Sequence, residues 1–264
     1  MLFINLIEAN LTTRRLGREI TYYPFTDSTN DDLWELLADG EAAPGQLVIT
    51  DHQRVGRGRR GRTWSAAPGL GLTFSVLLRP DLPMGRLGLL SLAAGVAVVD
   101  ALADDEVTAL LKWPNDILAE GRKLGGILIE SRLVGGAPAV VLGIGLNVNE
   151  QPGDFPNEIR HGAIAVRQIR QVPVQRELLL ARLLNRLETL TTGDLPSVTA
   201  LWQDRCAHLG QGVRFHDGEE WVEGQFRGLT SDGQGEIEIG DELRLVTAGE
   251  LAWPIGGRAA QGGP

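Results

Sequence analysis

The spacing of apolar residues along the first 200 positions predicts a mixture of helices and strands. Helical spacing or long apolar runs predict helices over 28–40, 85–104 and 172–190. Alternating or short apolar runs predict strands over 45–53, 69–80, 109–134 (strand, turn, strand) and 138–149. Several of these strands should pair as one mixed or antiparallel sheet with helices packed against it, which makes the fold class α+β.

The helix predicted over 28–40 carries its own start and stop signals. Ser28 and Thr29 are candidate N-caps, two aspartates follow in the first turn, and Gly40 can end the helix. The segment 172–190 repeats leucine at helical spacing, which is typical of an amphipathic helix that faces a core. Residues 1–20 give only a weak helical pattern.

The pattern changes near residue 208. Residues 210–251 form short alternating runs broken by Asp-Gly, Ser-Asp-Gly and Gly-Asp, which predicts four or five strands joined by hairpins. We therefore predict a first domain over 1–207, a small all-β domain over 208–255 and a disordered tail over 256–264.

Composition and charge exclude several classes of protein. The net charge of −9 argues against a general nucleic-acid binder, since no surplus of lysine and arginine is available to neutralise phosphates. The single cysteine, Cys206, allows no intrachain disulfide and suits a cytoplasmic location. Asn5 and Glu8 interrupt the apolar start, which is unlike a signal peptide, and no apolar run approaches the roughly 18 residues of a membrane span.

The common signatures of several enzyme classes are missing. The sequence contains no phosphate-binding G-x-x-x-x-G-K-[S/T] motif, no G-x-G-x-x-G motif that opens a helix after a strand, and no G-x-S-x-G motif. Its four histidines and one cysteine are scattered without zinc-ligand spacing. A nucleophilic hydrolase and a zinc enzyme are therefore poorly supported.

The candidate chemistry begins at residues 54–65, RVGRGRRGRTWS, which we call the arginine loop. It holds five arginines and three glycines in an otherwise acidic chain. Glycines allow a backbone to approach a ligand closely, and guanidinium groups bind phosphate or carboxylate through paired hydrogen bonds. The loop therefore indicates a site for anions, although a solvated basic loop or an RNA contact through Trp64 fits the same residues.

A second cluster follows at KWPND (112–116) and KLGGIL (123–128). Lys123 lies close to Gly125 and Gly126 in the sequence. It is suited to stabilise the negative charge that develops on a phosphate during a reaction. Asp116 fits a Mg²⁺ ligand, because this ion prefers oxygen donors. Taken singly, Asp116 fits a turn cap and Lys123 an exposed strand end equally well.

Together these segments resemble the biotin protein ligases. The motifs that carry the resemblance are, in order, DSTN (27–30), GRGRRGRTW (56–64), KWPND (112–116), KLGGIL (123–128) and GIGLNVN (143–149). The resemblance implies a catalytic domain like that of class II aminoacyl-tRNA synthetases, a mixed sheet packed with helices, followed by a small SH3-like β-barrel.

The resemblance also implies the reaction. The family joins biotin to ATP, with Mg²⁺ neutralising the pyrophosphate, and keeps biotinyl-5′-AMP in the site. It then transfers biotin to one lysine of the biotin carboxyl carrier protein of acetyl-CoA carboxylase or a related carboxylase. The loop would supply fixed positive charge where a carboxylate must attack a phosphate. A homodimer through an exposed sheet edge is common among relatives.

Matching positions receive roles from the resemblance, residue by residue. Biotin contacts, including hydrogen bonds to its ureido ring, are implied for Ser28, Thr29, Asn30 and Gln53. The loop segment that closes over biotin and the acyl-adenylate is matched by Arg57, Gly58 and Arg59. Lys123 matches the lysine that contacts the biotin carboxylate and the α-phosphate, and Arg59 matches the residue that retains the adenylate.

The remaining matches concern the nucleotide and the acceptor. Arg62 and Trp64 match positions beside the phosphates and adenine, and Asn147 matches a residue near the nucleotide. Asp116 matches an acidic residue that acts through a metal or by steering the acceptor lysine. No metal ligand set and no general base for that lysine are assigned.

Two departures and two alternatives complete the prediction. The 27 residues before Ser28 are too few for a helix-turn-helix domain, so we expect no DNA partner, and Gly125 stands where alanine is common. A lipoate-type ligase on the same fold and an RNA-binding module are the alternatives.

Because glycine-rich loops lose much entropy on ordering, we predict that the arginine loop is mobile when empty and ordered by biotin.

Overall fold

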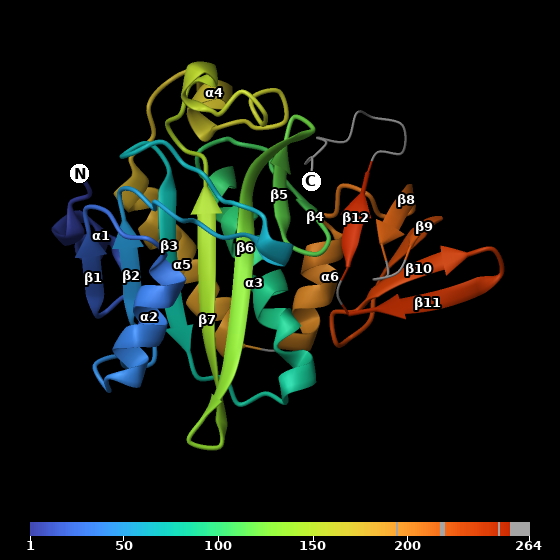
Figure 1. Ribbon diagram of the computed structural model, residues 1–264, viewed down its shortest axis with the longest axis horizontal. Coiled ribbons are helices and arrows are strands. Elements are labelled where there is room, and N and C mark those ends of the chain that lie inside the picture. The colour runs from blue at the N-terminus through green and yellow to red at the C-terminus, as the bar shows by residue number, and fades with distance from the viewer. Residues whose placement is uncertain (194, 217–219, 248, 254–264) are drawn as a thin grey trace.

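The computed structural model describes residues 1–193, 195–216, 220–247 and 249–253, which form two sheets with helices around the larger one (Figure 1). The larger sheet has seven strands in the order β1-β2-β3-β7-β6-β5-β4. These are β1 (Ile20–Tyr23), β2 (Leu47–Thr50), β3 (Leu72–Leu78), β4 (Leu110–Lys112), β5 (Asp116–Ala119), β6 (Arg122–Val134) and β7 (Ala137–Leu146). β1 and β2 pair in parallel and the other neighbours are antiparallel, which confirms the predicted mixed sheet.

Helices cover both faces of this sheet, which explains why its central strands are apolar at successive positions. α2 (Thr29–Ala38) packs Leu33 and Trp34 on one face against Val48 and Val141. The opposite face and its larger core are covered by α1 (Ile4–Asn10), α3 (Gly88–Ala103) and α5 (Arg176–Thr192). The three helices predicted from periodicity are confirmed.

α3 is the core helix behind the sheet. Together with the preceding turn, residues Met84–Ala103 are long and apolar enough to cross a membrane by composition, but 78% of that window is buried inside the fold. Its small residues let it pack closely; a side chain on Gly95 would lie 3.1 Å from Leu111 of β4. The apolar run therefore reflects burial among protein neighbours.

Several short elements were not predicted. They are β1, α4 (Val166–Arg170), α6 (Val198–Gln203) and the 3₁₀ turns η1 (Arg59–Gly61), η2 (Met84–Arg86), η3 (Pro152–Asp154) and η4 (Leu195–Ser197). Each spans seven residues or fewer, which is too short for a period to be recognised.

The five remaining strands form the second sheet, in the order β11-β10-β9-β8-β12. They are β8 (Gly212–His216), β9 (Trp221–Leu229), β10 (Gly235–Ile239), β11 (Glu242–Val246) and β12 (Glu250–Ala252). The predicted hairpin-linked strands are confirmed. Over the described residues the sheet is open, with β11 and β12 at its edges, so SH3-like closure stays a prediction. The predicted tail over 256–264 lies outside the described residues.

The second sheet packs against the first through a continuous core. The ring of Phe226 lies 6.4 Å from that of Trp113 and 6.5 Å from that of Trp202. An ion pair of 2.9 Å joins Arg86 to Asp232 at the surface. The two sheets are thus held in a fixed relation, while the domain boundary near residue 207 stays a prediction.

Candidate active site

The first wall of the candidate site is the N-terminal turn of α2. Ser28 has the extended backbone of an N-cap, and its Oγ accepts a hydrogen bond of 3.3 Å from the Asp31 amide, as predicted. Ser28, Thr29 and Asn30 are each at most 4% exposed. Three small polar residues are therefore buried at the start of a helix, where every polar atom needs a partner.

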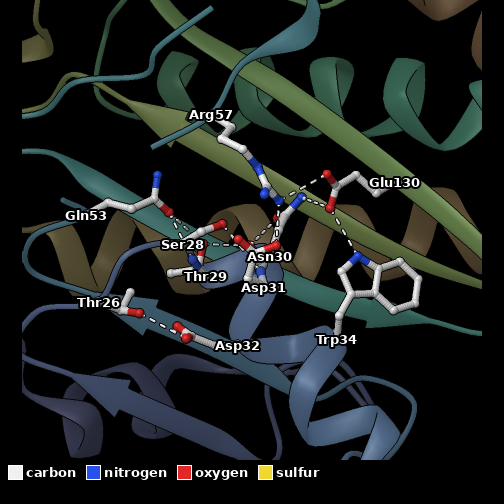
Figure 2. A network of polar contacts seen from close by, with 11 residues as sticks. Thr26, Ser28, Thr29, Asn30, Asp31, Asp32, Trp34, Gln53, Arg57 and Glu130 are labelled. Atoms are coloured by element: carbon white, nitrogen blue, oxygen red, sulfur yellow. Dashed lines mark hydrogen bonds and ion pairs between the residues drawn. The ribbon is translucent and has the colours of Figure 1, made fainter. Parts of the chain in front are cut away.

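Hydrogen bonds connect this turn to Gln53, which follows β2 (Figure 2), and to Ser75 of β3. The Thr29 amide donates to Gln53 Oε1 at 3.0 Å, so two residues that were predicted to bind biotin are in contact. The Thr29 hydroxyl lies 2.7 Å from Ser75 Oγ, which in turn donates to Asn30 Oδ1 at 2.6 Å. A side chain at Gly143 of β7 would lie 2.4 Å from Asn30 Oδ1, so this glycine makes the space that Asn30 fills.

The arginine loop forms a small hairpin above this wall. The Gly58 amide donates to the Arg62 carbonyl at 2.7 Å, and the Trp64 amide donates to the Gly56 carbonyl at 2.9 Å. Arg60 turns the chain with a φ of 56°. These contacts give the loop the backbone hydrogen bonds of a hairpin, and its predicted ordering by biotin stays a prediction.

Each end of the loop is held by carboxylates. Arg57 Nη2 donates to Asp31 Oδ1 of α2 at 2.6 Å and to Glu130 Oε1 of β6 at 3.2 Å. Near the other end, Arg62 pairs with Glu250 of β12. The loop therefore bridges the larger sheet and the second sheet.

The predicted catalytic residues lie together at the β5–β6 end of the sheet. Lys123 Nζ lies 2.5 Å from Asp116 Oδ1, and Lys112 Nζ lies 3.8 Å from Asp116 Oδ2. Arg59 Nη1 donates to Asn115 Oδ1 at 3.4 Å, which brings the loop to the same cluster. Three cations thus surround one carboxylate.

Burial lowers the pKa of two cations in this cluster. Burial lowers the pKa of the Lys112 ammonium, with the nearby charges of Lys123 and Arg62 adding to the effect and Asp116 opposing it. Burial also lowers the pKa of the Arg59 guanidinium. With Lys112, Lys123 and Arg59 gathered around the single carboxylate of Asp116, the cluster carries excess positive charge, as expected of a site that receives phosphates.

The surroundings of Asp116 do not fit a resident Mg²⁺ ligand. Both carboxylate oxygens face lysine ammonium groups, which a divalent cation would have to displace. Across the part of the chain that the structure describes, no three His, Cys, Asp or Glu side chains form a group that could hold a metal. The prediction of Asp116 as a metal ligand is therefore not supported.

Trp64 and Gly145 form the floor beside this cluster. A side chain on Gly145 of β7 would lie 2.4 Å from the Trp64 ring, so the indole lies directly on the strand backbone. Trp64 Nε1 is buried and has no hydrogen-bond partner among the residues that the structure describes. A buried N–H without a partner is rare, which makes it a candidate donor to a ligand.

Asn147 has a supporting role here. Its side chain is 3% exposed, and its Nδ2 donates to the Ile164 carbonyl at 3.1 Å and to the Lys123 carbonyl at 3.4 Å. The Lys123 amide donates to the Gly162 carbonyl at 2.7 Å. Asn147 therefore anchors the strand that presents Lys123, and a nucleotide contact by its side chain stays a prediction.

Comparison with known proteins decides the family. The model of the Biotin/lipoate A/B protein ligase family matches residues 22–147. The biotin–acetyl-CoA-carboxylase ligase of Mycobacterium tuberculosis is 35% identical over 243 residues, which cover 89% of this chain and 88% of the relative. The chain belongs to the biotin protein ligase family.

Two further members of the family are similar to this chain over most of its length. The bifunctional ligase/repressor BirA of Bacillus subtilis is 31% identical over 93% of this chain and 77% of its own length. The biotin protein ligase from Aquifex aeolicus, solved in complex with biotin and ATP, superposes with a TM-score of 0.76 at 28% identity and covers 89% of this chain and 98% of that one.

Sequence reasoning missed three carboxylate or hydroxyl partners of the site. Ser75, Glu130 and Glu250 contact predicted site residues but lie outside the motifs. Glu130 alone carried a signal, since a carboxylate that ends the otherwise apolar run 124–130 is expected to have hydrogen-bond partners where the strand is partly buried. Ser75 and Glu250 are placed only by strand register, which no local pattern reveals.

Proposed function

We propose that this chain activates biotin with ATP and attaches it to a carrier protein. One observation carries the proposal: a buried neutral wall at α2 and a cationic cluster at β5–β6 meet under one arginine-rich hairpin. The wall suits a neutral ureido ring, and the cluster suits a carboxylate that meets a triphosphate.

The first half-reaction joins the two anions. An oxygen of the biotin carboxylate attacks the α-phosphorus of ATP, the bond from that phosphorus to the bridging oxygen breaks, and pyrophosphate leaves. Lys123 and Arg59 lie where they would neutralise the carboxylate and the α-phosphate, which otherwise repel each other. The ion pair of Lys123 with Asp116 would hold the ammonium in place until the substrates arrive.

Arg62 and Trp64 complete the nucleotide side in this proposal. Arg62 is largely exposed and exchanges Glu250 for a phosphate. The unpartnered Nε1 of Trp64 finds an acceptor on the bound nucleotide. Mg²⁺ would arrive with the phosphates of ATP, since Asp116 does not fit as its ligand.

The second half-reaction transfers biotin. The amine of one lysine on the biotin carboxyl carrier domain of a carboxylase attacks the acyl carbon, AMP leaves, and the amine loses a proton. We assign Ser28, Thr29, Asn30 and Gln53 to biotin, and Arg57 and Gly58 to the loop above it. We further infer that the second sheet is the family's SH3-like module and that the enzyme works in the cytoplasm; a homodimer stays a prediction.

Biotin-dependent exchange of labelled pyrophosphate into ATP tests the proposal without any carrier. Exchange with biotin but not with lipoate is the expected result. Exchange with lipoate alone would move the activity to a lipoate-type ligase. Absence of exchange in folded protein with either acid would overturn the proposal. The RNA-binding alternative is weakened because Arg54 and Arg57 already pair with carboxylates.

A further inference from the structure

Glu130 lies on β6, seven residues beyond Lys123, and none of the motifs includes it. Its side chain is 31% exposed and reaches both the turn of α2 and the arginine loop (Figure 2). Three donors converge on its carboxylate, from Asn30, Trp34 and Arg57. A carboxylate with three donors from two separate elements is a junction between them.

The two oxygens of Glu130 serve different elements. Oε2 accepts from Asn30 Nδ2 and from Trp34 Nε1, each at 3.1 Å. Oε1 accepts from Arg57 Nη2 at 3.2 Å. One oxygen therefore faces the wall of the site and the other faces the loop that covers it.

The oxygen that faces the wall fixes the direction of a chain of hydrogen bonds. An ionised carboxylate only accepts, so the amide nitrogen of Asn30 must face Glu130 and its Oδ1 must face Ser75. Ser75 then uses its single proton on Asn30, so Thr29 does not accept from Ser75, and the Thr29 proton is directed to Ser75 Oγ at 2.7 Å or to Gln53 Oε1 at 3.2 Å. The lone pairs of Thr29 are left to accept from a ligand N–H.

The oxygen that faces the loop, Oε1, helps to fix the distance between the arginine loop and the start of α2. Arg57 is held by Glu130 from the sheet and by Asp31 from the helix. These two ion pairs keep this end of the loop next to the start of α2, where the loop residues proposed to cover biotin are needed.

We propose that Glu130 is a positioning residue for biotin, which couples the wall of the site to its cover. Through Oε2 it sets the Asn30 amide and the acceptor state of Thr29; through Oε1 it holds Arg57. This inference rests on the proposed function and deepens it, because it specifies a ligand that presents an N–H donor to Thr29.

Three variants of Glu130 and Arg57 separate the two oxygens. Glu130→Gln keeps an acceptor oxygen for Asn30 and Trp34 but turns an NH₂ group toward Arg57. Glu130→Met removes both acceptors at similar volume. Arg57→Ala removes the loop partner. We measure KM for biotin, KM for ATP and kcat in pyrophosphate exchange, with the melting temperature as the folding control.

We expect Glu130→Gln to raise KM for biotin on the order of tenfold, as for a lost charge-assisted hydrogen bond, with kcat and KM for ATP within about twofold of wild type. In the Arg57→Ala background, Glu130→Gln should add nothing, because its partner is already absent. Glu130→Met should still raise KM for biotin in that background, because the wall is disturbed as well.

Two results would overturn the inference while wild-type exchange is intact. One is additivity of Glu130→Gln with Arg57→Ala, which is expected of a general structural role. The other is an unchanged KM for biotin in Glu130→Met. Loss of exchange in the wild-type protein would instead reject the proposed function, so the two failures are distinguishable.

Discussion

Gly143 and Gly145 lie two residues apart on β7, face the same side of the sheet, and support two opposite kinds of site. Gly143 makes room for Asn30 in the wall proposed to bind biotin, where neutral side chains are buried and hydrogen-bonded to one another. Gly145 lies under Trp64 in the half proposed to bind the nucleotide, where charges crowd one another and the buried Nε1–H of Trp64 has no partner among the described residues. The polar groups of the first half thus hold one another, whereas we expect Trp64 in the second half to gain its partner from the ligand.

The largest expected effect concerns the nucleotide half. Lys123→Met removes the cation proposed to meet both the biotin carboxylate and the α-phosphate. We expect pyrophosphate exchange to fall by on the order of 10²- to 10³-fold, as when one preorganised charge is lost from a transition state. The melting temperature should change little, since Asp116 keeps Lys112 as a partner. Exchange within about threefold of wild type would remove Lys123 from the mechanism.

Alanine substitutions at Gly143 and Gly145 form a matched pair that tests whether the two halves of the site bind different substrates. Alanine at either position would place a methyl group 2.4 Å from an atom of the side chain packed on it, at a cost of about 1–3 kcal/mol. We expect Gly143→Ala to raise KM for biotin on the order of tenfold and Gly145→Ala to raise KM for ATP by a similar factor.

Steady-state kinetics on both variants checks this division. Each variant is the control for the other, because strand, substitution and overlap distance are the same. If both variants raised the same KM, the two halves would not be separate.

The variant Lys112→Met tests whether a buried ammonium group in the cationic cluster lowers the stability of the folded protein. Burial lowers the pKa of Lys112 in the folded protein below its ordinary value of 10.5, so the folded state binds this proton less tightly than the unfolded chain. Wild-type stability is therefore reduced at neutral pH and recovers as pH rises from the lowered pKa toward 10.5.

We accordingly expect Lys112→Met to melt at a higher temperature than wild type near pH 7, with the difference shrinking at higher pH. Thermal unfolding of both proteins across that range provides the measurement. A variant that is less stable at pH 7 would show that Lys112 is held favourably by Asp116.

The smallest expected effect is at the outer end of the loop. The Arg62–Glu250 pair lies at the surface, where ion pairs contribute roughly 0–1 kcal/mol. Glu250→Gln frees Arg62 for a phosphate, so we expect KM for ATP to fall by less than about fivefold, with KM for biotin unchanged. A rise in KM for ATP would mean that Glu250 positions the loop.

The sequence motifs predicted most of what lies along a single element. Ser28 as an N-cap and the juxtaposition of Lys123 with Asp116 follow from local signals in a helix start and a two-strand turn. Contacts made across the sheet had no such signal. The pairing of β3 with β7 places Ser75 opposite Gly143, and Asn30 of α2 packs over that glycine and contacts Ser75. This register is set by core packing distributed over the whole fold.

One interpretation illustrates the opposite error, in which a residue type indicated more than its surroundings support. Asp116 has the oxygen ligands that Mg²⁺ prefers, but two lysines that the sheet brings beside it already neutralise the carboxylate. These lysines lie on the neighbouring strands β4 and β6, and no local pattern around Asp116 reveals them.

The Arg62–Glu250 pair also bears on biosynthesis, because 188 positions separate its members along the chain. During translation the arginine loop is made early, and its carboxylate partner on β12 is among the last described residues to leave the ribosome. The loop therefore spends most of synthesis with Arg62 unpaired, and this end of the active site closes only after β12 has paired with β8.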